Sequence, residues 1–360
     1  MKTIKLFDPF ITKDEEKTTL QVLNSHFWAS GAGIEKVKKF EDSFKKYINC
    51  DQCIAVNSGT AALHLALSLF DLKGKEVILP SMTFVSTAHA VIMNGGKPIF
   101  TEIDDETLCL DSQKIEKNIN KKTQVVLPVH FGGMSCDLQS IQKICSENNL
   151  ELVEDAAHAA GSKYDNKKIG KHGKAVCFSF HPVKNLAMPT GGLIAINSNN
   201  SKSIMNDLKS KRWCGIKNRK KMEYDVGGIG WNYYMNEFSA AIGLTQLKRL
   251  DKMNCIRKKI AKRYSEEIKL ERKMPFDKNC SYHLFWIRVK NRNQFIKKME
   301  KEKIEIGIHY KPIHKMTYYN NKIKLPITEK IGKEVVSIPI HQNLKDDEIE
   351  KIIKIVNKFS

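Results

Sequence analysis

A lysine that follows a predicted strand is the first residue in this sequence that could carry covalent chemistry. Lys184 lies in the segment FSFHPVKNL, where a strand delivers Ser179 and Pro182 then breaks regular structure, which places Lys184 on a loop. A lysine amine becomes a nucleophile when desolvation lowers its pKa and leaves it uncharged. Most of the many lysines in this chain are expected to be surface residues. A catalytic role for Lys184 therefore depends on other residues that could act with it.

The most informative partner is an acidic residue at the end of another predicted strand. Asp155 lies in LELVEDAAHAAG, just after the apolar run Leu150–Val153. Its carboxylate could simply cap the next helix. It could also pair with the protonated nitrogen of a bound heterocyclic ring, which keeps that ring an electron sink. His158, one turn later on the same face, could reach an oxygen of the same ring or pack as an ordinary buried histidine.

A third segment could hold a phosphate group. Ser58, Gly59 and Thr60 form a small, flexible turn before the helical sequence AALHLALSLF. Free N–H groups and the helix dipole make such a turn a phosphate site, although the same pattern is a routine N-cap. Ser179 could add a hydroxyl group to that phosphate. Phe84, in PSMTFVSTAHAV, could stack on a cofactor ring or belong to the core.

The elements that must position these residues follow an α/β pattern. Short apolar runs alternate with helix-length segments between residues 50 and 200, which predicts a mostly parallel sheet covered on both faces. Ligands gather at the carboxyl ends of the strands in such sheets. The strand candidates are Cys53–Val56, Glu76–Leu79, Pro98–Phe100, Val125–Val129, Glu151–Val153, Ala175–Phe180 and Leu193–Ile196.

The pattern changes beyond Asn236 and predicts a smaller second domain. A long helix is expected over Glu237–Tyr264, followed by strands at His283–Val289 and Ile304–Ile308 and by helices at Asn293–Glu302 and Asp346–Lys358. We therefore divide the chain into a large domain, residues 1–245, and a small α+β domain, residues 246–360. The N-terminal segment 1–30 is expected to pack on the small domain.

Composition excludes several classes of protein. The net charge of +20 comes mainly from dispersed lysines, and no zinc finger or RNA-binding motif accompanies it, so we expect no nucleic-acid partner. No apolar run reaches the length of a membrane helix or a signal peptide, which predicts a cytoplasmic protein with no membrane partner. The nine cysteines are irregularly spaced. They predict mostly reduced, buried thiols and neither a disulfide framework nor a metal site.

The order and spacing of these segments are similar to those of the fold-type-I pyridoxal-phosphate (PLP) enzymes. Together, NSGTAALHLAL, PSMTFVSTAHAV, PVHFGG, VEDAAHAAGS, FSFHPVKNL and GWNYYMNEFSAAIGLTQL resemble the DegT/DnrJ/EryC1/StrS family of sugar aminotransferases over nearly the whole chain. The resemblance implies a seven-stranded, mostly parallel sheet and PLP as cofactor, with its amino form PMP as intermediate. It also implies that an amino group is transferred from L-glutamate to a keto-sugar linked to a nucleoside diphosphate.

The resemblance also implies a role for each site residue. Lys184 would bind the cofactor covalently and act as the catalytic base, and Asp155 would bind the pyridine nitrogen. The other implied contacts are Phe84 and His158 with the ring, Ser58, Gly59, Thr60 and Ser179 with the phosphate, Asn232 with the phosphate of a partner subunit, and His309, Tyr310 and His314 with the nucleotide-sugar. The shared site would make the protein a homodimer.

Two positions depart from the family pattern. The family commonly reads GEGG where this chain has Pro189-Thr190-Gly191-Gly192, and it reads NYR where this chain has Asn232-Tyr233-Tyr234. Both lie near the expected reaction centre, so substrate preference could differ. A PLP- or PMP-dependent sugar dehydratase, an aminocyclitol aminotransferase and a non-catalytic PLP-binding paralogue remain alternatives, although relatives that deoxygenate sugars place histidine at the position of Lys184.

Overall fold

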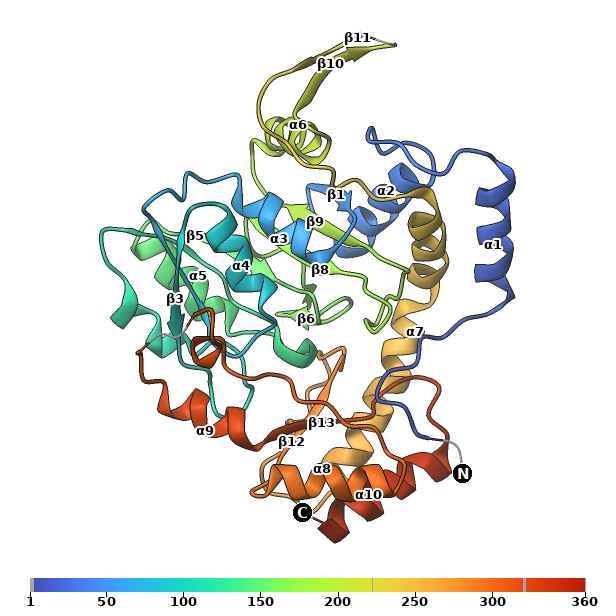
Figure 1. Ribbon diagram of the computed structural model, residues 1–360, viewed down its shortest axis with the longest axis vertical. Helices are drawn as coiled ribbons and strands as arrows, with labels where there is room; N and C mark the ends of the chain where they lie inside the picture. Colours follow the sequence, from blue (N-terminus) through green and yellow to red (C-terminus); the bar gives the residue numbers. More distant parts are fainter. Residues whose placement is uncertain (1–2, 222, 320–321, 360) are drawn as a thin grey trace.

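A seven-stranded sheet forms the centre of the computed structural model, which describes residues 3–221, 223–319 and 322–359 (Figure 1). The strand order is β1-β9-β8-β5-β4-β2-β3, and the run from β8 to β3 is parallel, whereas β9 is antiparallel to both of its neighbours. All seven strand candidates are confirmed. The strands are β1 (Gln52–Val56), β2 (Glu76–Pro80), β3 (Lys97–Thr101), β4 (Thr123–Val126), β5 (Glu151–Asp155), β8 (Ala175–Ser179) and β9 (Gly192–Ile196).

Both faces of the sheet are buried, which explains why the strands read as continuous apolar runs. Alternate residues face opposite ways, so Ile54 and Val56 of β1 belong to one core, while Cys53 and Ala55 belong to the other. The first core includes residues of α3 (Gly59–Leu67), α4 (Ser86–Met93) and α6 (Ser201–Arg212). The second includes residues of α2 (Lys36–Ile48), α5 (Leu138–Glu147) and the N-terminal half of α7.

The long helix α7 (Glu237–Glu267) runs from the large sheet to the C-terminal part of the chain, as predicted (Figure 1). There β12 (Phe285–Arg288) pairs antiparallel with β13 (Val335–Ile338), and α8 (Arg292–Lys301), α9 (Pro326–Glu334) and α10 (Asp346–Phe359) pack around them. The predicted strand Ile304–Ile308 is wrong. That segment makes only isolated bridges, because Ile304 pairs with Ile4 of the N-terminal segment whereas Gly307 pairs with Ser337 of β13, so no continuous ladder forms.

The N-terminal segment links the two parts of the molecule. Ile4 exchanges backbone hydrogen bonds with Lys303 and Glu305, and Asn343 donates to the Asp8 carboxylate at 2.7 Å. The chain then forms α1 (Lys13–Asn24), which packs against α7. Residues 3–8 therefore contact the C-terminal part, whereas α1 lies at the outer edge of the molecule beside the N-terminal part of α7 (Figure 1).

The remaining elements are short. The hairpin β10 (Ile216–Lys220) and β11 (Glu223–Val226) projects away from the body of the molecule (Figure 1). A two-residue ladder joins β6 (Lys163–Tyr164) to β7 (Lys167–Lys168). Single turns of 3-10 helix are η1 (Ser112–Lys114), η2 (Glu116–Asn118), η3 (Phe131–Gly133) and η4 (Ile313–Lys315).

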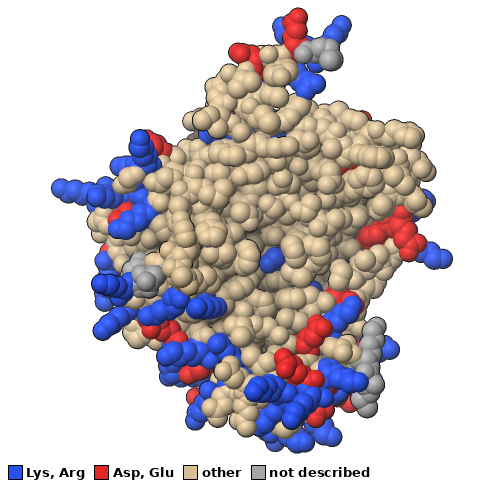
Figure 2. Space-filling model, in the orientation of Figure 1, with Lys and Arg blue, Asp and Glu red and all other residues tan. Residues whose placement is uncertain are grey.

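Thiols and surface charge agree with the expectations from composition. All nine cysteines are described and unbridged, and seven of them are buried. Cys50 and Cys53, the CxxC pair, have sulfurs 3.2 Å apart. Figure 2 shows lysines and arginines mixed with acidic residues around the C-terminal part, while a broad area in the middle of this face carries few charges and an acidic patch lies at the lower end of α1. Among the described helices, none is long and apolar enough to cross a membrane.

Candidate active site

Lys184 occupies the loop between β8 and β9, where its amine enters the protein interior. The backbone N–H of Lys184 donates to His181 O at 2.8 Å, which closes a tight turn around Pro182. Burial of the amine lowers the pKa of Lys184 to about 8, and the field of Asp155 opposes this shift in part. A substantial fraction of the amine is therefore uncharged near neutral pH, which is the nucleophilic form.

Asp155 faces the same interior space from the carboxyl end of β5. Its carboxylate is buried, and it accepts hydrogen bonds from Thr87 Oγ1 at 2.8 Å and from the Ala157 N–H at 3.0 Å. These two donors fix the direction of the carboxylate. Burial raises the pKa of Asp155, and these hydrogen bonds and the charge of Lys184 oppose the rise. A buried carboxylate whose desolvation is only partly offset is suited to bind a cationic N–H group.

Ser58, Gly59 and Thr60 form the turn between β1 and α3. Ser58 caps α3 by accepting from the Ala61 N–H at 3.1 Å. Two glycines allow the turn to lie against β8 and β9. A Cβ on Gly59 would approach Ser179 Cβ to 2.7 Å, and one on Gly192 would approach Ser58 O to 2.2 Å. Ser179 therefore lies directly beside the free N-terminus of α3, where an anionic group is favoured.

These segments enclose one cavity of about 410 Å³. It contains ten of the twelve predicted site residues together with groups that the sequence did not single out. Its lining is Ser58, Gly59, Thr60, Leu63, Thr83, Phe84, Ser86, Val129, Asp155, Ala157, His158, Ser179, His181, Val183, Lys184, Thr190, Gly191, His309 and Tyr310. Phe84 is 55% exposed at this cavity, so it is not a core residue.

Histidines and a tyrosine form the wall of the cavity opposite the sheet. The Tyr310 hydroxyl lies 3.3 Å from His158 Nε2, and the two rings are nearly parallel. His158 Nδ1 accepts from the Gly132 N–H at 3.2 Å. Burial lowers the pKa of His309 to about 4 and lowers the pKa of His158 well below that of a free histidine. These imidazoles are therefore neutral at physiological pH and add no charge to the cavity.

Two predicted residues lie outside the cavity lining. His314 is fully buried, with Nδ1 2.6 Å from Ser81 Oγ and Nε2 3.3 Å from Glu329. Asn232 has an exposed side chain, and its carbonyl accepts from Asn57 Nδ2 at 3.2 Å. Asn57 directly precedes the turn before α3. Asn232 thus borders the turn Ser58–Thr60 of its own chain, while its side chain points to the surface.

His283 is a residue of this site that the sequence analysis missed. Its Nε2 lies 3.4 Å from Lys184 Nζ, although almost one hundred positions separate them. The sequence placed His283 only at the start of a strand. No local motif marks it, because its role arises from the docking of the C-terminal part onto the loop that carries Lys184.

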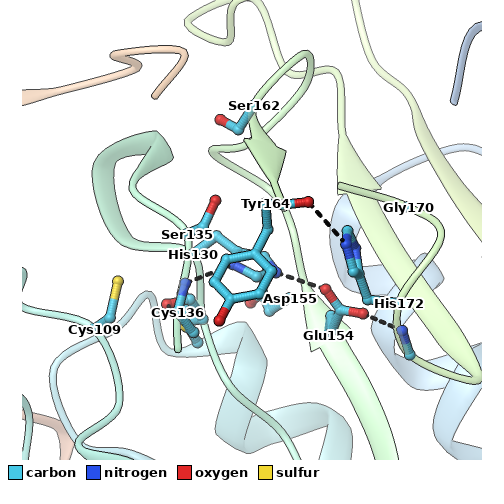
Figure 3. A network of polar contacts seen from close by, with 12 residues as sticks. Cys109, His130, Ser135, Cys136, Glu154, Asp155, Ser162, Tyr164, Gly170 and His172 are labelled. Carbon is cyan, nitrogen blue, oxygen red and sulfur yellow. Dashed lines mark hydrogen bonds and ion pairs between the residues drawn. The ribbon is translucent and has the colours of Figure 1, made fainter. Parts of the chain in front are cut away.

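A buried polar network lies behind Asp155 (Figure 3). His130 Nε2 is 2.8 Å from Glu154 Oε2, and His130 Nδ1 accepts from the Cys136 N–H at 3.2 Å. Because Nδ1 accepts, the proton lies on Nε2, which donates to Glu154. Glu154 also accepts from the Gly173 N–H. This network ties β5 to the loop before β8 and stabilises the strand that presents Asp155.

The two departures from the family pattern have different surroundings. Thr190 lines the cavity, and its hydroxyl donates to Asn57 O. This hydrogen bond joins the loop after Lys184 to the residue that precedes the turn Ser58–Thr60. Tyr234 makes an isolated bridge to Val56 and is partly buried. Thr190 is therefore placed to affect the cavity directly.

The fold and the cavity define an α/β enzyme of the aminotransferase class. The model of the DegT/DnrJ/EryC1/StrS aminotransferase family matches residues 9–357, and the chain belongs to this family. It is 32% identical to the spore coat polysaccharide biosynthesis protein SpsC of Bacillus subtilis over 371 residues, which cover 97% of this chain and 95% of SpsC. It is 29% identical to GDP-perosamine synthase of Vibrio cholerae over 369 residues, 99% of each chain.

A solved structure extends this similarity to the whole fold. Spr1654 of Streptococcus pneumoniae, assigned as a sugar aminotransferase, is known in PLP and PMP forms. The PLP form matches with a TM-score of 0.94 and 26% identity, covering 99% of this chain and 98% of Spr1654. The PMP form gives the same TM-score and identity. The mixed sheet is thus that of a sugar aminotransferase fold.

Proposed function

We propose that this chain is a PLP-dependent aminotransferase that moves an amino group, from L-glutamate, to a keto-sugar linked to a nucleoside diphosphate. The observation that carries the proposal is that one cavity contains an amine of lowered pKa, Lys184, and a buried carboxylate, Asp155. Spr1654 has PLP and PMP forms, and the name of a second relative contains a GDP-linked product. These names support the cofactor and the substrate class.

The residues present fit this cofactor. Lys184 would bind it covalently, Asp155 would accept a hydrogen bond from its protonated ring nitrogen, and the turn Ser58–Thr60 with Ser179 would hold its phosphate. Gly59 has no side chain, so the turn can lie directly against Ser179 and no Cβ of residue 59 shields its N–H groups. Phe84, exposed at the cavity, supplies an aromatic face for a ring. PLP, when bound, supplies the electron sink that makes the α-proton of an amino acid acidic.

The protein groups perform proton transfer and orientation. The amine of Lys184, uncharged in part near neutral pH, would take the proton from the α-carbon of the amino donor and hold it for return during the transfer. Asp155, held by Thr87 and Ala157, would keep the ring nitrogen protonated. The neutral imidazoles and Tyr310 exclude water without adding competing charge. Donor and acceptor use the same cavity in turn, so ping-pong kinetics are expected.

The decisive experiment follows nitrogen from donor to product. The purified chain with PLP is incubated with ¹⁵N-glutamate and a panel of dTDP-, UDP- and GDP-linked keto-sugars, and products are analysed by mass spectrometry. Amino transfer gives a labelled amino sugar and 2-oxoglutarate. A sugar dehydratase would instead yield a deoxygenated, unlabelled sugar, and labelled aminocyclitols from cyclitol ketones would indicate the related aminotransferase. A non-catalytic paralogue would change neither substrate.

We also propose that the enzyme works as a cytoplasmic homodimer in which Asn232 reaches the phosphate of the partner subunit. Apolar side chains exposed on and near α1 support an interface, namely Ile11, Leu20, Leu23 and Trp28, all at least 44% exposed. The charged residues of α1 gather in its first turn, at its lower end in Figure 2, so the apolar side chains of its C-terminal half lie away from them. Light scattering should give twice the chain mass, and Leu20→Glu should produce monomers with reduced PLP affinity. A monomeric wild-type chain would contradict this proposal.

A further inference from the structure

His283 is a buried histidine that combines a contact with the reactive lysine and an unpartnered ring nitrogen. The side chain is 2% exposed, its Nε2 lies 3.4 Å from Lys184 Nζ, and its Nδ1 has no hydrogen-bond partner among the described residues. A buried polar atom without a partner is costly. The position is therefore poorly explained by packing alone, and the contact with Lys184 offers a reason for a histidine here.

The ring of His283 is held from several sides. Phe7, from the N-terminal segment, stacks on it at 5.5 Å with an interplanar angle of 15°, and the His158 ring lies 4.4 Å away. The backbone on either side is also fixed, because Tyr282 O accepts from Arg257 at 3.2 Å and the Leu284 N–H donates to Gly132 O at 3.2 Å. The imidazole thus has little freedom to turn away from Lys184.

The charges around Lys184 make an acceptor useful. Asp155 is the carboxylate whose field reaches the amine, and it is also the group that would bind the cofactor nitrogen. The other titratable groups that face Lys184 are His158, His181, His283 and His309, and burial lowers the pKa of each of them. They are neutral, so they cannot compensate a positive amine by charge. A neutral imidazole can still accept a hydrogen bond from it.

We propose that His283 is a positioning residue for Lys184, with its Nε2 accepting a hydrogen bond from the lysine amine and its Nδ1 carrying the proton. The contact aims the amine into the cavity and stabilises its charged form whenever it is not bound to the cofactor. It also makes the reactivity of Lys184 depend on the seating of the C-terminal part and of Phe7. The inference rests on the proposed role of Lys184.

The test measures the pKa of Lys184 without turnover. Full-length chain stripped of cofactor is labelled with acetic anhydride across a pH series, and the peptide that contains Lys184 is quantified by mass spectrometry. The wild-type midpoint is expected at about pH 8. His283→Phe, which removes the acceptor, should lower the midpoint by about 0.5 unit or more, because an acceptor favours the charged amine. Labelling at pH 7 should rise severalfold. His283→Gln, which keeps an acceptor oxygen, should restore the midpoint.

The matched control is His341→Phe, a buried histidine that contacts Lys5 O rather than Lys184. It should leave the midpoint unchanged. An unshifted midpoint in folded His283→Phe protein would overturn the proposal. If that variant does not fold, ¹⁵N NMR of the wild-type imidazole decides, because a proton on Nε2 excludes the proposed tautomer. Since neither readout uses turnover, a failed glutamate assay would refute the proposed function and leave this inference standing.

Discussion

The two walls of the cavity differ in the groups that they provide. The wall formed by the large sheet supplies the charged and anion-binding groups, which are Lys184, Asp155 and the turn Ser58–Thr60. The opposite wall, formed by the C-terminal part, supplies His309 and Tyr310, and His283 lies outside the lining in contact with Lys184; these groups remain neutral at physiological pH. The reacting groups therefore come from the ends of the strands. The second wall excludes water and orients the substrate that enters the cavity.

Removal of the amine from the charged wall should have the largest effect. Lys184→Ala is expected to reduce kcat by about 10⁴-fold, because it removes both the nucleophile and the proton carrier. It should also abolish the visible absorbance of lysine-bound PLP. Lys297→Ala, at an exposed position of α8, should behave as wild type in both measurements. Full turnover by Lys184→Ala would refute the catalytic role that is assigned to Lys184 on the charged wall.

The acid on the same wall should have the second largest effect. Asp155→Asn keeps the shape of the side chain but removes the charge that binds the ring nitrogen, and kcat should fall about 10²- to 10³-fold. Glu154→Gln is the matched control one residue earlier on β5. It should lower the free energy of unfolding by about 1–3 kcal/mol, since it weakens the buried contact with His130, and should change kcat only slightly. Equal losses of kcat would erase the distinction between the two carboxylates.

The pH dependence of cofactor capture should reveal the state of Lys184. Its pKa is lowered to about 8, so below this pH the uncharged fraction, and the rate of covalent capture of PLP by cofactor-free chain, should rise about tenfold per pH unit. Above pH 8 the rate should level off. The free energy of unfolding should also rise with pH. The unfolded lysine keeps its proton to higher pH than the folded one, whose pKa is about 8. As pH rises above 8, the cost of burying a charged amine therefore falls. Stopped-flow absorbance provides the measurement, and a rate that still rises at pH 10 would contradict it.

Changes on the neutral wall should be the smallest. Tyr310→Phe removes the hydroxyl 3.3 Å from His158 Nε2 but keeps the ring. We expect KM for the sugar acceptor to rise about three- to tenfold with kcat nearly unchanged, as for the loss of one hydrogen bond. Steady-state kinetics at saturating glutamate test this. A loss of kcat as large as that of Asp155→Asn would show that the two walls do not divide their roles in this way.

The fold of the large part was predictable because its strands are buried on both faces. The runs around Ile54, Ile78 and Ile194 are therefore apolar over most of their length, and the helices between them are long enough to be recognised. The strand expected at Ile304–Ile308 failed for a related reason. Ile304 and Ile306 pack against the core, but Ile308 is exposed and the segment pairs with β13 only through Gly307. Hydrophobic pattern indicates burial and does not specify which partner is paired.

By itself, the sequence determined which residues carry charge at the strand ends, because Lys184, Asp155 and the turn at Gly59 belong to local motifs whose place in an α/β sheet follows from chain order. Only the tertiary structure decided what faces them. His283 from the C-terminal part contacts the amine, Phe7 from the N-terminal segment stacks on His283, and His314 is buried outside the cavity. Local pattern cannot encode such contacts, since they depend on how separate elements dock.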